Sequence, residues 1–148
     1  MNVLADANIV LRLAEPGHPM YPPAQAAAAA LRARGDALCI VPQVLYEFWV
    51  VATRSVQQNG LGKTPAEADI DVAFILAGFP LFPDTPDVFP AWRTLVTAHA
   101  VSGKPAHDAR LVAAMQVHGL THLLTFNVGD FQRFPIPVLD AAAVAAAP

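Results

Sequence analysis

The sequence predicts an α/β fold, a three-layer α/β/α sandwich in which helices cover both faces of a mainly parallel sheet of about five strands. Short apolar segments with strand character alternate with longer segments with helical character, which is the pattern of this class. The chain has 148 residues, of which 55% are hydrophobic and 14% are charged, as expected for one globular domain. We assign residues 1–140 to this domain and residues 141–148 to an alanine-rich C-terminal tail.

Short apolar runs that stop at polar or turn-forming residues predict the strands. They cover residues 2–5, 37–41, 81–82, 122–126 and 136–139. Helical segments connect most of the consecutive strands, and such crossovers join parallel neighbours. The order of the elements therefore predicts a sheet that is mainly parallel and is buried on both faces.

Proline, glycine and capping residues mark the limits of the helices between these strands. Pro42 directly follows the second strand and predicts a helix start, since proline is favoured in the first helical turn. Thr64-Pro65-Ala66-Glu67 has the form of a capping box, and Gly35 stops the alanine-rich helix that precedes the second strand. The helices are expected at residues 8–15, 23–34, 42–54, 64–77, 87–100 and 108–118, with a frayed helical end in the tail.

Composition limits the possible functions. The formal net charge of −3 argues against a protein that holds nucleic acid by a general positive surface. No uncharged apolar stretch reaches the length of a membrane span, so we expect no membrane association. Asp6 falls where the apolar core of a signal peptide should begin, so we expect a cytoplasmic protein.

Four acidic residues occupy comparable places in the predicted topology. Asp6 directly follows the first strand, Glu47 lies in the first turns of the helix after the second strand, and Asp130 lies just beyond the fourth strand. Asp108 starts the helix that runs back into the fourth strand, so that helix begins on the carboxyl side of the sheet. In parallel sheets, the residues that bind ligands or catalyse reactions usually lie at this edge. We therefore expect the four carboxylates to converge.

Converging carboxylates repel one another unless positive charge lies between them. A hard divalent cation, Mg²⁺ or Mn²⁺, held by oxygen ligands and waters, meets this need. Such a cation activates water and stabilises charge that develops at phosphorus. The alternative for single residues is structural: Asp6 as an N-cap and Asp108 as a favourable charge at a helix N-terminus.

The residues around these acids resemble the motifs of PIN-domain nucleases in order and spacing. The resemblance runs from Met1 to about Leu139, and its last two motifs are specific because they also match at non-acidic positions. The motifs are Asp6-Ala7-Asn8-Ile9, Tyr46-Glu47-Phe48, His107-Asp108-Ala109-Arg110-Leu111-Val112-Ala113 and Leu124-Thr125-Phe126-Asn127-Val128-Gly129-Asp130-Phe131. Within this superfamily the chain looks like a VapC-type toxin of a bacterial type II toxin–antitoxin pair.

The resemblance implies a PIN-like fold and a metal-dependent endoribonuclease that hydrolyses RNA phosphodiesters with metal-activated water. It also implies that a cognate antitoxin protein silences the enzyme. By this resemblance the catalytic metal ligands are Asp6, Glu47, Asp108 and Asp130, with Mg²⁺ or Mn²⁺ as the cofactor. The same comparison gives supporting roles at Asn8, Thr125 and Asn127.

Further expectations concern the surface. Basic groups near the acids are candidates for contact with RNA phosphates: Arg54, Lys104, His107 and Arg110. We expect the large aromatic residues to belong to the core rather than to stack on bases: Phe48, Trp49, Phe89 and Trp92. Part of the apolar surface is expected to serve a homodimer or an antitoxin interface. The rival interpretation of the whole chain is a catalytically silent PIN-fold module that binds RNA or protein.

Overall fold

Within residues 1–147, which the computed structural model describes, four strands form one parallel sheet in the order β2-β1-β3-β4. The strands are β1 (Asn2–Ala5), β2 (Ala37–Cys39), β3 (His122–Thr125) and β4 (Val138–Asp140). Every neighbouring pair is parallel, with Leu4 opposite both Cys39 and Leu123. The predicted α/β class and the parallel sheet are confirmed.

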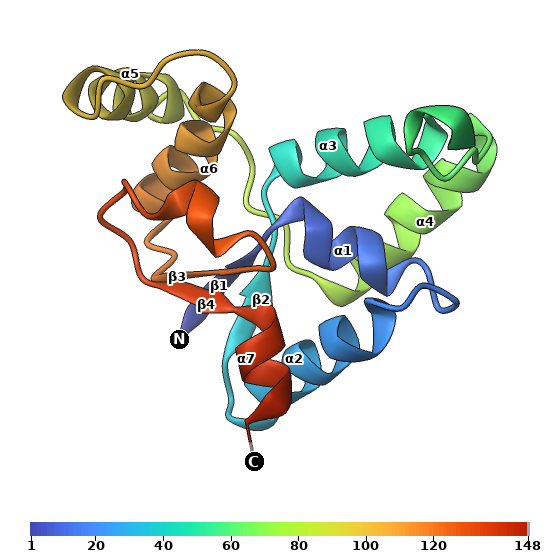
Figure 1. The fold of residues 1–148 in the computed structure, drawn as a ribbon. Helices are drawn as coiled ribbons and strands as arrows, with labels where there is room; N and C mark the ends of the chain where they lie inside the picture. The colour runs from blue at the N-terminus through green and yellow to red at the C-terminus, as the bar shows by residue number, and fades with distance from the viewer. Residues whose placement is uncertain (148) are drawn as a thin grey trace.

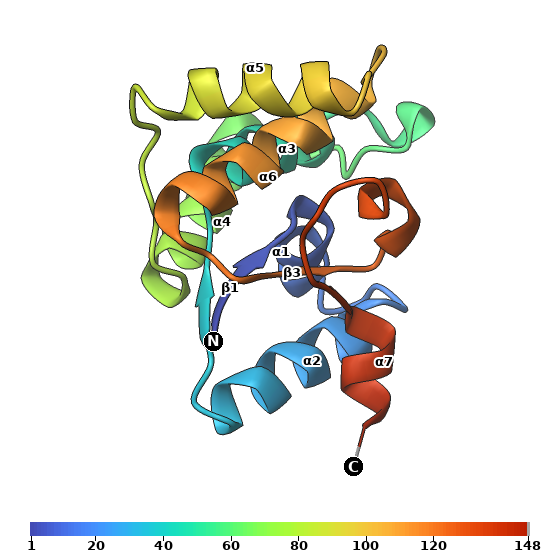
Figure 2. The same cartoon turned by 90° about the vertical axis from the view of Figure 1, so that its left-hand side faces the viewer.

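Helices surround the sheet. They are α1 (Ala7–Leu13), α2 (Tyr21–Ala33), α3 (Pro42–Thr53), α4 (Pro65–Gly78), α5 (Val88–Ala98), α6 (Pro105–His118) and α7 (Ala141–Ala146). Figure 1 shows α5 and α6 together on one side of the sheet, with α1, α2 and α7 on the other. Figure 2, turned by 90°, shows α5 lying across α6. No helix within residues 1–147 combines the length and the apolar character that a membrane crossing requires.

The strand β1 lies at the centre of the core. Its residues Val3, Leu4 and Ala5 are fully buried, because strands pair with it on both edges and helices cover both of its faces. A strand buried in this way reads as a continuous apolar run rather than an alternating one. The next residue, Asp6, is therefore held at a fixed position on the carboxyl edge of the sheet.

The fifth predicted strand, residues 81–82, is reduced to a single parallel bridge between Leu81 and Ile40. The main-chain amide of Ile40 donates to the carbonyl of Pro80, and the amide of Phe82 donates to the carbonyl of Ile40. Prolines at positions 80 and 83 flank this short contact, and a proline has no amide hydrogen to extend a ladder. The flanking prolines therefore explain why the pairing does not grow into a full strand.

Most helix limits differ from the sequence-based expectation by one to three residues, and two of the differences matter for the site and the tail. The helix α6 begins at Pro105 rather than Asp108, so Asp108 lies inside its first turn. Proline again takes an early helical position, as it does in α3 and α4. In the tail, α7 is a helix capped by Asp140, and it packs against α2 with Ala141 fully buried. The last tail residue, Pro148, lies outside the described residues.

The aromatic residues divide between core and surface. Phe48 is fully buried, which confirms its expected core position. Trp49 and Trp92 are partly buried and pack against the core. Phe89 was expected in the core, and this is wrong: it lies in the first turn of α5 and is 63% exposed. The inward face of that helix is instead supplied by Val88 and Leu95.

Candidate active site

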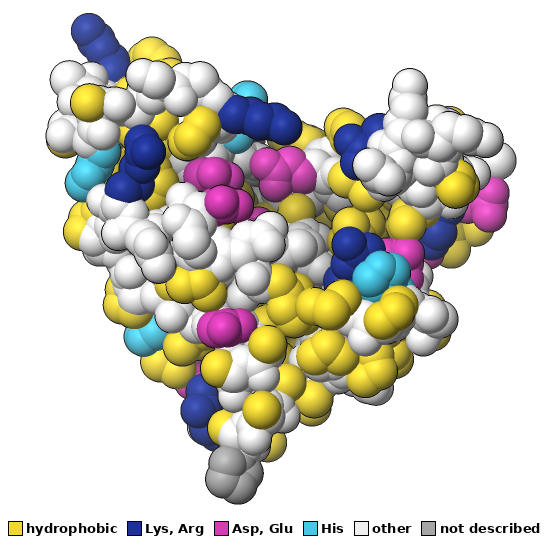
Figure 3. Space-filling view, in the orientation of Figure 1, with side chains coloured by type: hydrophobic (Ala, Val, Ile, Leu, Met, Phe, Trp, Pro, Cys, Tyr) yellow, Lys and Arg dark blue, Asp and Glu magenta, His cyan; other side chains and the backbone are white. Residues whose placement is uncertain are grey.

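The carboxyl edge of the sheet opens into a hollow. Figure 3 shows acidic side chains gathered there, between the part of the molecule formed by α5 and α6 and the arm formed by α3 and α4, with basic side chains at the rim. A pocket of about 370 Å³ in this region is lined by Glu47, Lys104, Pro105, His107, Asp108 and Asp130. Three of the four predicted acids therefore share one pocket.

The fourth acid, Asp6, lies at the base of this site and is 7% exposed. Its Oδ1 accepts a hydrogen bond from the amide of Ala7 at 2.7 Å, which makes it the N-cap of α1. Its Oδ2 accepts one from the Thr125 hydroxyl at 2.8 Å and one from the Asn8 side chain at 3.3 Å. The capping role is confirmed, but the second oxygen is held by groups that capping does not require.

A small polar network surrounds that second oxygen. The Asn8 amide group also donates to the Thr125 hydroxyl at 3.0 Å, and its Oδ1 accepts from the amide of Phe126 at 3.2 Å. The amide of Asn127 donates to the Thr125 hydroxyl at 3.0 Å. Asn8 and Thr125 thus join the ends of β1 and β3, while Asn127 contributes its main chain and keeps its side chain exposed.

The structure adds one residue that sequence reasoning missed. Gln43, in the first turn of α3, is 6% exposed. Its Nε2 donates to Glu47 Oε1 at 3.1 Å and to the carbonyl of His107 at 2.8 Å, and so links α3 to the first turn of α6. Its position four residues before Glu47 was the available signal, since residues so spaced share a helix face.

Burial and mutual repulsion set the electrostatics of the site. Desolvation raises the pKa of Asp6 to about 6, assisted by the charges of Glu47 and Asp108 and opposed by the Thr125 and Ala7 hydrogen bonds. Desolvation also raises the pKa of Asp108 to about 6, assisted by the charges of Asp130 and Glu47 and opposed by His107. These effects connect all four acids through Asp108, whose carboxyl is affected by Glu47 and Asp130 and itself affects Asp6.

The next question is whether the oxygen atoms of the four acids suit a bound divalent cation. Within residues 1–147, no group of three or more His, Cys, Asp or Glu side chains is placed so that it could hold a metal ion as one cage. Mg²⁺, however, commonly keeps several waters and binds through only one or two carboxylates. Oxygen donors, raised carboxylate pKa values and an open, water-accessible pocket fit such a hydrated ion.

The four basic candidates fall in different places. Lys104 and His107 line the acidic pocket itself, and with Arg110 they also line an adjoining pocket that contains Glu47. Arg54 is the C-cap of α3, where its Nη2 donates to the carbonyl of Asn59. It is not among the residues that line either pocket. The structure therefore gathers three of these side chains around the acids and leaves Arg54 at the far end of α3.

Comparison with known proteins relates the chain to one family and to several solved structures. The family model for the PIN domain matches residues 3–137. Among solved structures, VapBC-1 of nontypeable Haemophilus influenzae is similar with a TM-score of 0.69 and 15% identity, covering 95% of this chain and 98% of that one. VapBC2 of Rickettsia felis, bound to a promoter DNA fragment, gives a TM-score of 0.68 and 16% identity, covering 94% and 98%.

A third similar structure is VapC20 of Mycobacterium tuberculosis, described as a toxin that cleaves the sarcin–ricin loop. Its TM-score is 0.57 at 19% identity, with 82% of this chain and 86% of that chain covered. At these identities the likeness shows the fold alone. No curated protein matches the chain in sequence.

The raised pKa of Asp6 predicts how the metal-free protein responds to pH. Between about pH 4 and pH 6 the folded state binds a proton that the unfolded state releases, so stability falls as the pH rises through this range. In EDTA, the wild type should lose about 2 kcal/mol more than Asp6→Asn between pH 4 and pH 7. Urea unfolding at several pH values measures this difference, and parallel curves for the two proteins would contradict it.

The hydrogen bonds of Gln43 predict that its removal lowers the stability of the protein. Gln43→Ala leaves Glu47 and the His107 carbonyl without a buried donor, so the free energy of unfolding should fall by about 1–3 kcal/mol. Gln132→Ala, at an exposed position, is the control and should change it by about 0.5 kcal/mol or less. Equal urea midpoints for the two variants would show that the Gln43 contacts contribute no stability.

Proposed function

The chain belongs to the PIN domain family, and from this premise we propose that it is a metal-dependent endoribonuclease that hydrolyses RNA phosphodiesters. The observation that carries the proposal is the convergence of Asp6, Glu47, Asp108 and Asp130 from four separate elements on one cleft. A fold has no structural need to assemble four acids that repel one another. A nuclease needs them, because they attract the cation that the reaction uses.

Each group at the cleft has a role in this proposal. The four carboxylates are the oxygen donors for Mg²⁺ or Mn²⁺, which when bound supplies an activated water and offsets charge at the phosphate. Thr125 and Asn8 hold the orientation of Asp6, and Gln43 holds that of Glu47. Lys104 and His107 contact the RNA backbone, because basic side chains position phosphates without reading sequence. Arg110 contacts the RNA from the adjoining pocket.

We also propose that the chain is the toxin of a bacterial toxin–antitoxin pair. The support is the likeness of its fold to the VapBC structures and to VapC20, which is described as a toxin that cleaves the sarcin–ricin loop. By this proposal it acts on RNA in the cytoplasm, and a cognate antitoxin protein silences it. A neighbouring gene for a small DNA-binding protein would support the assignment.

Large apolar side chains on the arm formed by α3 and α4 favour a protein interface. Tyr46, Val50 and Ile70 are each more than half exposed. Because exposed apolar groups gain by leaving water, we propose that part of this surface joins two copies of the chain.

The nuclease proposal predicts that cleavage depends on the acids and on a divalent cation. With single-stranded RNA and Mg²⁺ or Mn²⁺, Asp6→Asn and Asp108→Asn should lower the cleavage rate at least about a hundredfold, and EDTA should abolish cleavage. Asp69→Asn, an exposed acid on α4, is the matched control and should cleave at the wild-type rate.

Two outcomes would contradict this proposal. Cleavage that persists in EDTA and in Asp6→Asn would exclude the metal mechanism. RNA binding without any cleavage under these conditions would favour the silent binding module.

The dimer proposal predicts the mass of the isolated protein. Sedimentation equilibrium at micromolar concentration should give twice the 15.7 kDa mass of one chain. Tyr46→Ser combined with Val50→Ser, which makes the exposed face of α3 polar, should shift the mass toward one chain. A wild-type protein that sediments as a monomer would contradict the dimer.

A further inference from the structure

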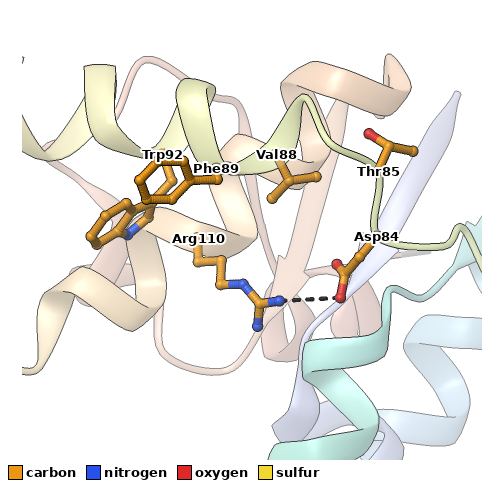
Figure 4. Close-up of a pocket in the computed structure, with 6 residues that line it drawn as sticks. All are labelled: Asp84, Thr85, Val88, Phe89, Trp92 and Arg110. Carbon is orange, nitrogen blue, oxygen red and sulfur yellow. Dashed lines mark hydrogen bonds and ion pairs between the residues drawn. The ribbon is translucent and has the colours of Figure 1, made fainter.

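A second cavity lies beside the acidic cleft. It has a volume of about 380 Å³ and is lined by Asp84, Thr85, Val88, Phe89, Trp92 and Arg110, as Figure 4 shows. This volume is within the range of about 300–1,000 Å³ that is usual for small-molecule sites. Arg110 also lines the pocket that contains Glu47 and His107. The two cavities are therefore neighbours that share one guanidinium-bearing side chain.

One wall of this cavity is aromatic and exposed. The Phe89 side chain is 63% exposed, which places a large apolar ring in water without a role in the core. Its ring stacks on that of Trp92, with centroids 5.9 Å apart and an interplanar angle of 29°. The Trp92 indole is held in place because its Nε1 donates to the carbonyl of Ala106 at 2.8 Å. The exposed Phe89 ring is thus held by stacking on a hydrogen-bonded Trp92 indole.

The opposite wall is polar. The Arg110 Nη2 donates to Asp84 Oδ2 at 3.1 Å, and both side chains remain more than one third exposed. In Figure 4 the guanidinium lies between the aromatic pair and the carboxylate. The wall therefore offers hydrogen-bond donors and acceptors side by side. A ligand that suits the cavity has an aromatic face for Phe89 and a polar edge for Arg110 and Asp84.

We propose that this cavity binds one unpaired nucleobase of the RNA whose phosphate lies at the four acids. The inference rests on the proposed nuclease function and extends it to the nature of the substrate. Unpaired bases are recognised in proteins by stacking on aromatic rings and by hydrogen bonds to their polar edges. A base inside a duplex is stacked on both faces and paired along its edge, so only an unpaired base can enter the cavity.

Binding without cleavage tests the subsite separately from the reaction. The Asp6→Asn protein in EDTA is titrated with fluorescent decamers of oligoadenylate, oligouridylate and an abasic ribose-phosphate strand. The base-bearing strands should bind about tenfold more tightly than the abasic strand, as expected for one base–aromatic stack. In the Phe89→Ala background this advantage should disappear, and Phe89→Tyr should restore it.

A matched control comes from the same chain. Phe74 on α4 is also an exposed phenylalanine, at 84%, and is not among the residues that line either cavity. Phe74→Ala should leave the affinity for all three decamers unchanged. Thermal melting of each variant checks folding, and little change is expected because both rings are exposed.

The outcomes separate this inference from the nuclease proposal. Base-dependent binding that requires Phe89, in a wild type that does not cleave RNA, keeps the subsite and overturns the nuclease. Cleavage by a wild type whose affinity for bases is unaffected by Phe89→Ala overturns the subsite. A Phe89→Ala variant that changes the sedimenting mass and leaves base binding intact also overturns it, since the ring would then contact a second copy of the chain.

Discussion

The structure depends on one buried carboxylate, that of Asp6, at the end of the central strand. Removing a charge from water is costly unless hydrogen bonds or opposite charges compensate. Here the compensation comes from Ala7, Asn8 and Thr125, which tie together α1, β1 and β3. Because β1 pairs on both edges, the position of Asp6 cannot shift without disturbing the sheet. The rigid centre of the fold thus fixes the first group of the site.

These hydrogen bonds offset only part of the cost of burying the Asp6 charge, and the neighbouring acids add to that cost. A pKa near 6 means that the hydrogen bonds do not offset the full cost of burial and of the neighbouring acids. The protein retains Glu47, Asp108 and Asp130 around the same cleft, although each one adds repulsion. Under the proposed function, such an arrangement would lower stability in exchange for affinity toward a cation, as functional sites commonly do. Gln43 limits the loss by holding Glu47 and the first turn of α6 together.

Topology explains why the sequence predicted the acids and not their surroundings. Strand order alone places Asp6 and Asp130 at one edge, whatever the details of packing. Asp108 was also placed correctly, although its helix starts at Pro105, because one turn does not change the edge at which a helix begins. The spacing of Gln43 and Glu47 could place both on one helix face, but the sequence does not show that Gln43 is buried against α6. Phe89 was assigned to the core by its residue type, yet the orientation of α5 depends on tertiary contacts that no local pattern records.

Under the proposed function, the distribution of charge explains how a protein with a net charge of −3 would bind RNA. Lys104 and His107 line the same pocket as three of the acids, and Arg110 joins them in the adjoining pocket. Without a cation, the four clustered carboxylates would repel an RNA phosphate at the place where the reaction has to occur. With a cation, the sign at the centre changes and the basic groups add to the attraction. Metal binding would then govern substrate binding as well as chemistry, and the aromatic cavity would choose among RNA strands after that electrostatic condition is met.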